Sequence, residues 1–272
     1  MNTITKTIKF NATFDRVFKK TFSEVEILAT LLKVILNIEV NKEDIVIENN
    51  ETTNYIDLKT SNYDIKLSIN NLYDIELEMQ RIRRNYNYKD RVIYYLSNMI
   101  SKSLKKGSSY EYKECISISF VNYEINKKEC IDIISFKDTN NEEISRHKII
   151  LIDLTKINNC DNLELKKWLT LMKSNKPLSL KGDNYIMDKA IDRIVNINSD
   201  RKEQAILESR LKAERDYYAG IEGAERKGEH NKQIEIAKKM LKDGVSLELI
   251  SKYTSLTIAE LIKITKWISK LK

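Results

Sequence analysis

Two short alternating segments carry the side chains that are best placed to do chemistry. They are residues 63–69, Tyr-Asp-Ile-Lys-Leu-Ser-Ile, and residues 73–80, Tyr-Asp-Ile-Glu-Leu-Glu-Met-Gln. Side chains of a strand alternate between its two faces, so Asp64 and Lys66 share the polar face of the first segment. Glu78 and Gln80 lie on the polar face of the second. The pattern predicts two strands whose polar faces bear carboxylates.

The loop between the segments decides how these carboxylates face each other. A two-residue loop, Asn70-Asn71, would place Asp64 opposite Leu77 and mix the polar and apolar faces. A three-residue loop, residues 70–72, keeps the apolar faces together, because asparagine tolerates the left-handed conformation that such a loop needs. It places Asp64 opposite Glu78 and Lys66 opposite Glu76. We therefore expect the three-residue loop.

Opposed acids suggest a divalent-metal site. Directly paired side chains have Cβ atoms about 4.5–5.5 Å apart, so two carboxylates placed in this way repel each other. Mg²⁺ or Mn²⁺ would offset the repulsion, because hard cations prefer carboxylate oxygens. The alternative is a polar face in solvent. Other catalytic schemes have less support, since the chain has two histidines and no P-loop, G-x-S-x-G or cysteine–histidine cluster.

The surrounding elements predict an α/β or α+β core over residues 1–183. We expect helices at about 14–37 and 88–106, strands at 45–48, 115–121, 130–136 and 148–154, and a short helix capped by Asp161. Residues 184–272 predict a charged helical region. It ends in three short helices, at about 231–243, from Ser246, and from Thr257, where Glu260 completes a capping box.

Composition narrows the class of protein. The 272 residues include 47 Lys and Arg against 40 Asp and Glu, a formal charge of +7. This balance favours polyanions such as nucleic acid as partners, although an AT-biased genome would also enrich lysine. Three widely spaced cysteines indicate buried reduced thiols. Residues 1–14 lack the apolar segment of a signal peptide and no membrane span is expected, so a cytoplasmic protein is predicted.

Several motifs together resemble one family. Asp64 followed by Glu78-Met79-Gln80 resembles the motif of recombination-promoting nucleases, the PD-(D/E)XK nuclease-family transposases. The likeness continues in Phe14-Asp15-Arg16-Val17-Phe18-Lys19-Lys20-Thr21-Phe22, in Arg91-Val92-Ile93-Tyr94-Tyr95, in Gly107-Ser108-Ser109-Tyr110, in residues 149–154 and in the tail segments 236–244 and 254–257. The resemblance implies a restriction-endonuclease-like PD-(D/E)XK core, a mixed sheet flanked by helices, with an α-helical C-terminal region.

The resemblance also implies an activity, Mg²⁺- or Mn²⁺-dependent hydrolysis of DNA phosphodiester bonds. Asp64, Glu78 and Met79 form the implied metal site. The wider superfamily has a lysine where this chain has Gln80, and a proline where it has Tyr63. An amide orients water but carries no charge. Lys66 is a candidate for the missing positive charge; the alternative is a cross-strand ion pair with Glu76.

Candidate DNA contacts are Arg91, Lys19 and Lys20, each of which also fits a plain surface position. The C-terminal helices resemble a helix-turn-helix, which can bind DNA or form a homo-oligomer. The preferred interpretation is a metal-dependent DNA endonuclease. The alternatives are a catalytically weak DNA-binding or regulatory protein that keeps the nuclease fold, and a helical interaction protein. Salt-sensitive DNA binding without cleavage would favour the former, and absence of DNA binding the latter.

Overall fold

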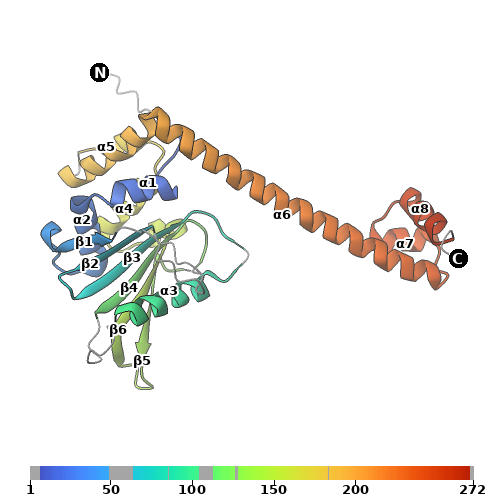
Figure 1. The fold of residues 1–272 in the computed structure, drawn as a ribbon, viewed down its shortest axis with the longest axis horizontal. Helices are drawn as coiled ribbons and strands as arrows, with labels where there is room; N and C mark the ends of the chain where they lie inside the picture. The colour runs from blue at the N-terminus through green and yellow to red at the C-terminus, as the bar shows by residue number, and fades with distance from the viewer. Residues whose placement is uncertain are drawn as a thin grey trace. The chain divides into compact units, whose positions relative to one another are not determined.

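A computed structural model describes residues 7–48, 64–84, 86–103, 113–125, 128–182 and 184–269. It divides into two compact units, residues 1–204 and 205–272, and each is described here by itself. Figure 1 shows the first unit as a sheet with helices on both faces. The first unit ends at Gln204 and includes α5 (Tyr185–Ser199), which packs on α1 (Asp15–Phe22) and α2 (Val25–Leu36). The domain boundary expected at residue 183 stays a prediction.

The first unit is built on a six-stranded mixed sheet in the order β1-β2-β3-β4-β6-β5. The strands are β1 (Ile45–Glu48), β2 (Ile65–Ile69), β3 (Tyr73–Gln80), β4 (Glu114–Val121), β5 (Ile131–Lys137) and β6 (Glu143–Asp153). β4 is parallel to both β3 and β6, while β1–β2, β2–β3 and β5–β6 are antiparallel. The mixed sheet confirms the predicted fold class.

The β2–β3 hairpin has the predicted register. Ile65 pairs with Leu77, Lys66 with Glu76 and Leu67 with Ile75, as the match of apolar faces requires. The loop contains the three predicted residues, and both asparagines have positive φ, 48° at Asn70 and 57° at Asn71. Ile65, Leu67, Ile75 and Leu77 are all buried, at most 1% exposed. The register therefore follows from burial of one face and from asparagine in the loop.

Helices cover both faces of this sheet. On the apolar face lie α1 (Asp15–Phe22), α2 (Val25–Leu36) and α4 (Leu163–Lys173). The ring of Phe18 lies 5.5 Å from that of Phe120 on β4, and the ring of Phe22 lies 6.1 Å from that of Trp168. On the opposite face α3 (Tyr88–Ser103) packs Val92, Leu96 and Met99 against residues of β4 and β6. The short 3₁₀ helices are η1 (Lys42–Asp44), η2 (Leu154–Asn159) and η3 (Pro177–Leu180).

Two helix boundaries differ from the sequence expectation. The helix expected at 14–37 is interrupted, because Glu24 has extended backbone angles and begins α2 anew. The helical periodicity continues through this break, so the apolar pattern does not reveal it. The cap of α4 is Asn162, whose side chain accepts the N–H of Leu165 at 3.0 Å, and not Asp161. Either residue type serves as an N-cap, so the sequence leaves a one-residue ambiguity.

The second unit contains three helical segments around a small core. They are the C-terminal part of α6 (Arg201–Lys242), α7 (Leu247–Thr254) and α8 (Ile258–Ser269). Ala237, Ile250, Leu256 and Leu261 form the core. The helix expected at 231–243 is the end of α6, and does not begin separately. The predicted starts are confirmed, since Ser246 caps α7 and the backbone N–H of Thr257 donates to Glu260 at 2.8 Å.

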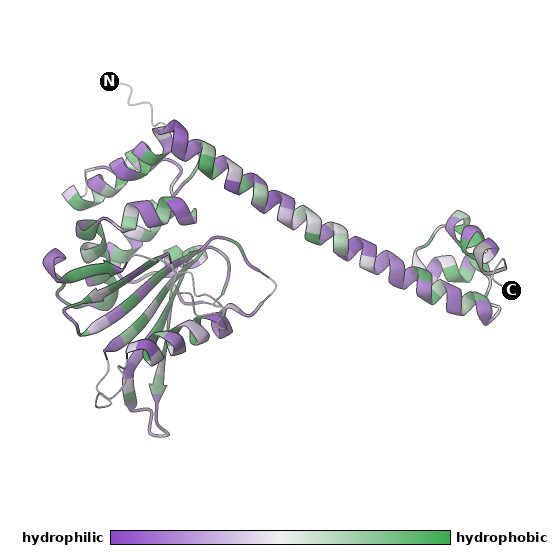
Figure 2. Ribbon diagram, in the orientation of Figure 1, coloured by the Kyte–Doolittle hydropathy of each residue, from purple (hydrophilic) through white to green (hydrophobic). Residues whose placement is uncertain are grey.

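The remaining sequence expectations have mixed standing. All three cysteines are free and buried, as expected. Among the described residues no helix has both the length and the apolarity to cross a bilayer. Figure 2 shows hydrophobic and hydrophilic residues alternating along the central strands and a mainly hydrophilic α6. Tyr63 and residues 104–112, with the predicted helix end and the segment Gly107-Ser108-Ser109-Tyr110, lie outside the described residues.

Candidate active site

The two motif carboxylates meet at one end of the β2–β3 pair. Asp64 directly precedes β2, and Glu78 lies near the end of β3 on the same face. Asp64 and Glu78 are the next residues beyond Ile65 and Leu77, the pair that ends the ladder. The Oδ2 atom of Asp64 accepts a hydrogen bond of 2.7 Å from the backbone N–H of Met79. The side chain of Asp64 is partly buried and that of Glu78 is buried, so neither carboxylate is fully exposed to solvent.

Burial makes both carboxylates difficult to ionise. Burial is the main reason that the pKa of Asp64 is raised to about 6; the hydrogen bond from Met79 opposes this shift, and the nearby charge of Asp15 contributes to it. Burial raises the pKa of Glu78 to about 7; Arg91 opposes this shift, while the charge of Asp64 adds to it. The negative charge of Asp64 disfavours ionisation of Glu78, and a bound cation would relieve this repulsion.

Two donors converge on a single oxygen of Glu78. The Oε1 atom accepts from the side-chain amide of Gln80 at 2.5 Å and from Nη2 of Arg91 at 2.6 Å. Arg91 reaches it from the first turns of α3, the helix that packs on this face of the sheet. Gln80 thus contacts the candidate metal ligand, and so does Arg91, which had been expected to contact only DNA.

α1 brings further charges to the site, some of which sequence spacing does not reveal. Asp15, at the start of α1, lies close enough to raise the pKa of Asp64, after burial, and Lys19 close enough to oppose that shift. Asp15 was not selected from the sequence, because only the packing of α1 on β3 brings it near the carboxylates. The residue belongs to the motif that resembles the family's first helix, which was the available signal.

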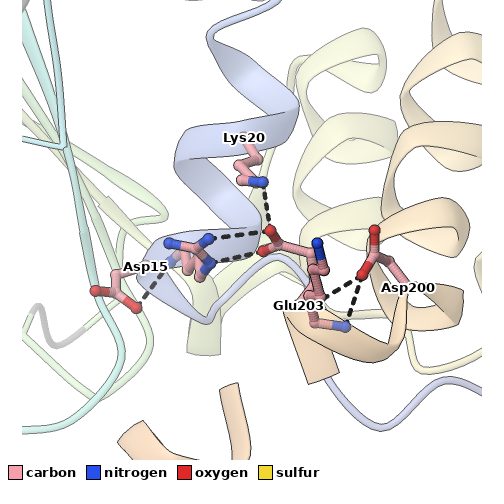
Figure 3. Close-up of polar contacts among 6 residues, drawn as sticks. Asp15, Lys20, Asp200 and Glu203 are labelled. Carbon is pink, nitrogen blue, oxygen red and sulfur yellow. Dashed lines mark hydrogen bonds and ion pairs between the residues drawn. The ribbon is translucent and has the colours of Figure 1, made fainter. Parts of the chain in front are cut away.

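Lys20 has a different environment from its neighbour. Figure 3 shows its ammonium group directed at Glu203, which also receives the guanidinium of Arg16. Both contacts measure 2.6 Å, and Asp200 accepts the backbone N–H groups of Lys202 and Glu203. Lys20 is therefore a partner of the start of α6. Its expected contact with DNA stays a prediction, weakened by this ion pair.

Lys66 is directed away from the two acids. Its Nζ atom lies 2.5 Å from Oε2 of Glu48 on β1, the strand on the other side of β2 from Glu78. Its cross-strand neighbour on β3 is Glu76, which was the expected ion-pair partner. The structure thus pairs Lys66 with a carboxylate other than the expected one, and its catalytic role stays a prediction.

A run of arginines follows the motif. The guanidinium of Arg81 lies 4.3 Å from the ring centroid of Phe14, which ties this segment to the start of α1. Arg83 and Arg84 are exposed. Arg84 is near enough to Glu78 for its charge to favour the ionised carboxylate. The segment therefore presents positive charge beside the carboxylates.

At the opposite end of β3 lie an ion pair and a buried histidine. Asp74 is paired with Lys113 at 3.1 Å. His147 is buried, and its Nδ1 atom accepts the backbone N–H of Cys115 at 2.9 Å. A cavity of about 360 Å³ lies beside it, lined by Leu72, Tyr73, Glu114, Ile144, Ser145, Arg146 and His147. The hydrogen bond fits the expected structural role of this histidine.

Two family models match the chain, one over the sheet-containing part and one over the C-terminal helices. The model of the PD-(D/E)XK nuclease family transposase matches residues 12–224, which include Asp64, Glu78 and α3. The model of the Rpn/YhgA-like nuclease family C-terminal HTH domain matches residues 230–266, the end of α6 with α7 and α8. No curated protein and no solved structure matches the chain. The chain therefore belongs to the PD-(D/E)XK nuclease family transposases and carries the C-terminal helix-turn-helix domain of the Rpn/YhgA-like nucleases.

Proposed function

We propose that this protein is a DNA endonuclease that hydrolyses phosphodiester bonds with the help of Mg²⁺ or Mn²⁺. The observation that carries the proposal is the location of Asp64 and Glu78 at one end of the hairpin, near enough for the charge of Asp64 to raise the pKa of Glu78. A guanidinium fixed on Glu78 and exposed arginines lie beside them. The expectations of a cytoplasmic location and of a homo-oligomer formed through the C-terminal helices stay predictions.

The residues present fit a magnesium ion. Mg²⁺ typically uses one or two protein carboxylates and completes its shell with water and substrate phosphate. Asp64 and Glu78 supply two such oxygen ligands, and Met79 is the third residue of the proposed set. Within the described ranges no group of three or more His, Cys, Asp or Glu side chains is arranged to hold a metal, so the ligand set depends on water and DNA. The raised pKa values of both acids, caused first by burial, support a cation here.

The chain's own side chains have distinct proposed roles. A bound metal ion would polarise the scissile phosphate and lower the pKa of an attacking water. The backbone N–H of Met79 holds the Asp64 carboxylate in place, and the amide of Gln80 holds that of Glu78. Exposed Lys19, Arg83 and Arg84 would bind the phosphates that flank the cleaved one. Hydrolysis then joins the water oxygen to phosphorus, breaks one bridging phosphorus–oxygen bond, and leaves a phosphomonoester and an alcohol.

The test is cleavage of supercoiled plasmid by the full chain in Mg²⁺, Mn²⁺ or EDTA. Wild type should nick or linearise the plasmid with either metal and not in EDTA, while Asp64→Ala should be inactive. Glu164→Gln, on an exposed residue of α4 that pairs with Lys167, is the matched control and should cleave normally. Equal residual cleavage by wild type and Asp64→Ala would show a contaminating nuclease and refute the proposed site.

One observation favours a second function. Gln80 stands where the wider superfamily has a charged lysine, and the C-terminal unit matches a helix-turn-helix model. A protein that binds DNA but cleaves it poorly fits both facts. Salt-sensitive binding, without metal-dependent cleavage at any protein concentration, would select this alternative.

A further inference from the structure

Arg91 is held in one position by three separate hydrogen bonds. Its Nη2 atom donates to Glu78 at 2.6 Å, its Nε atom donates to the hydroxyl of Tyr95 at 2.8 Å, and its Nη1 atom donates to the hydroxyl of Tyr86. The Arg91 Cζ atom lies 4.9 Å from the ring centroid of Tyr95 and 5.8 Å from that of Tyr86. A guanidinium with all three nitrogens engaged has lost most of its freedom before any substrate binds, as preorganised electrostatic groups require.

This charge lies beside the side chain at position 80. Arg91 and Gln80 donate to the same oxygen, Oε1 of Glu78, so their donor atoms are neighbours. A lysine at position 80 would project from the same strand face beside Glu78. Lys66, the alternative considered from the sequence, is paired with Glu48. Arg91 is thus a cation that the structure places in contact with a motif carboxylate.

We infer that Arg91 is a catalytic residue, which supplies from α3 the positive charge that Gln80 does not supply from β3. This inference rests on the proposed nuclease function and assigns one step of it. With metal and DNA bound, the guanidinium contacts a non-bridging oxygen of the scissile phosphate. It stabilises the negative charge that grows there as the water oxygen bonds to phosphorus and the leaving oxygen departs with its electron pair, to be protonated from the attacking water through solvent.

Two other roles for Arg91 make different predictions. If Arg91 only neutralises Glu78 in the metal-free protein, a saturating concentration of metal neutralises Glu78 instead. Removal of the Arg91 side chain then leaves the cleavage rate unchanged. If it only binds the DNA backbone, its removal weakens affinity and leaves the rate at saturating DNA unchanged. A catalytic Arg91 affects the rate at saturating metal and DNA, because its contact strengthens in the transition state.

The experiment compares wild type with Arg91→Gln, Arg91→Lys and the double variant Arg91→Gln/Gln80→Lys, in single-turnover cleavage at saturating Mg²⁺ and DNA. DNA affinity is measured in Ca²⁺ and thermal unfolding by circular dichroism. We expect Arg91→Gln to lose about 100-fold or more in rate, the loss typical of one preorganised transition-state donor, with a small change in affinity. Arg91→Lys should keep part of the rate, since a lysine keeps the charge but not the three-way hydrogen bonding.

The double variant is the decisive measurement. A lysine restored at position 80 should recover a large part of the rate lost in Arg91→Gln, although it repairs none of the hydrogen bonds to Tyr86 and Tyr95. Recovery excludes a purely structural role, including the case in which Arg91→Gln is destabilised. Unimpaired cleavage by Arg91→Gln, or no recovery in a folded double variant, overturns the inference while leaving the nuclease proposal intact. Absence of metal-dependent cleavage by wild type rejects the nuclease proposal, and the inference with it.

Discussion

Substituting Asp64 by asparagine should stabilise the metal-free protein while abolishing cleavage. The pKa of Asp64 is raised from 3.8 to about 6, first by burial, so the folded chain binds a proton at this site more tightly than the unfolded chain does. A carboxyl group with a raised pKa in the folded state does not lower the free energy of unfolding at pH below about 4, and lowers it by the full amount above about pH 6. Asparagine can still accept the hydrogen bond from Met79 and carries no charge.

The size of the effect follows from the shift. About two pKa units correspond to ~3 kcal/mol at most, because one unit is worth about 1.4 kcal/mol. Asp64 is partly exposed and titrates together with Glu78, so a gain of about 1–2 kcal/mol is the reasonable expectation at pH 8. Urea unfolding in EDTA, followed by circular dichroism, should show this gain for Asp64→Asn at pH 8 and its disappearance at pH 4. Asp161→Asn, at an exposed position, is the control and should change stability by less than about 0.5 kcal/mol.

Added Mg²⁺ should make wild type more stable than Asp64→Asn, the reverse of the order expected in EDTA. Binding to the folded state stabilises wild type in proportion to the logarithm of metal concentration, and the variant, with one ligand lost, should gain less. An Asp64→Asn protein that is less stable than wild type in EDTA at pH 8 would show that the carboxylate supports the fold. A gain independent of pH would show that charge burial is not its cause.

Three further predictions concern charges around the site. Glu203→Gln should lower the free energy of unfolding by about 1–2 kcal/mol at pH 7, because hydrogen bonds from two cations on α1 lower the pKa of Glu203 to about 2. The difference from wild type should vanish as pH falls from about 4.5 towards 2. A difference in urea unfolding that does not depend on pH would contradict this. Lys66→Gln should cleave DNA at nearly the wild-type rate and lose at most about 1 kcal/mol of stability, and a rate loss of orders of magnitude would return Lys66 to the site. Arg83→Ala combined with Arg84→Ala should reduce the slope of log affinity against log salt concentration by about 1.8, or 0.9 per lost phosphate contact, and an unchanged slope would remove both from the DNA interface.

The hairpin was predictable because one physical requirement determines it. Strand side chains alternate strictly, so a shift of one residue would bury a complete polar face and expose the apolar one. The interruption at Glu24 was not predictable in the same way, because the apolar spacing runs through it without a proline or glycine. The continuity of α6 was also missed, since its charged middle portion has no apolar stripe that distinguishes one long helix from two.

The acids of the site were predictable from spacing and motif, but their counter-charges were not. Asp64 and Glu78 come together through neighbouring strands, whose pairing the sequence constrains. The counter-charge of Arg91 reaches Glu78 only because α3 packs on the same face of the sheet. The like charge of Asp15 comes near Asp64 only because α1 packs on the other face. Lys66 was the nearest basic residue along the strand, and β1 supplied a different carboxylate for it. Contacts between packed layers require the tertiary structure.

The proposed role of Arg91 would also explain why position 80 can be a glutamine. A lysine on β3 would be fixed to the same strand as Glu78 and would remain beside it whether or not metal is bound. A guanidinium on α3 contacts Glu78 through one nitrogen and two tyrosine hydroxyls through the others, so it keeps its position when the carboxylate turns to a metal ion. Its charge is then available to the phosphate without a change in the helix. In the proposed mechanism, residues of the strands would hold the metal ion and α3 would supply the positive charge.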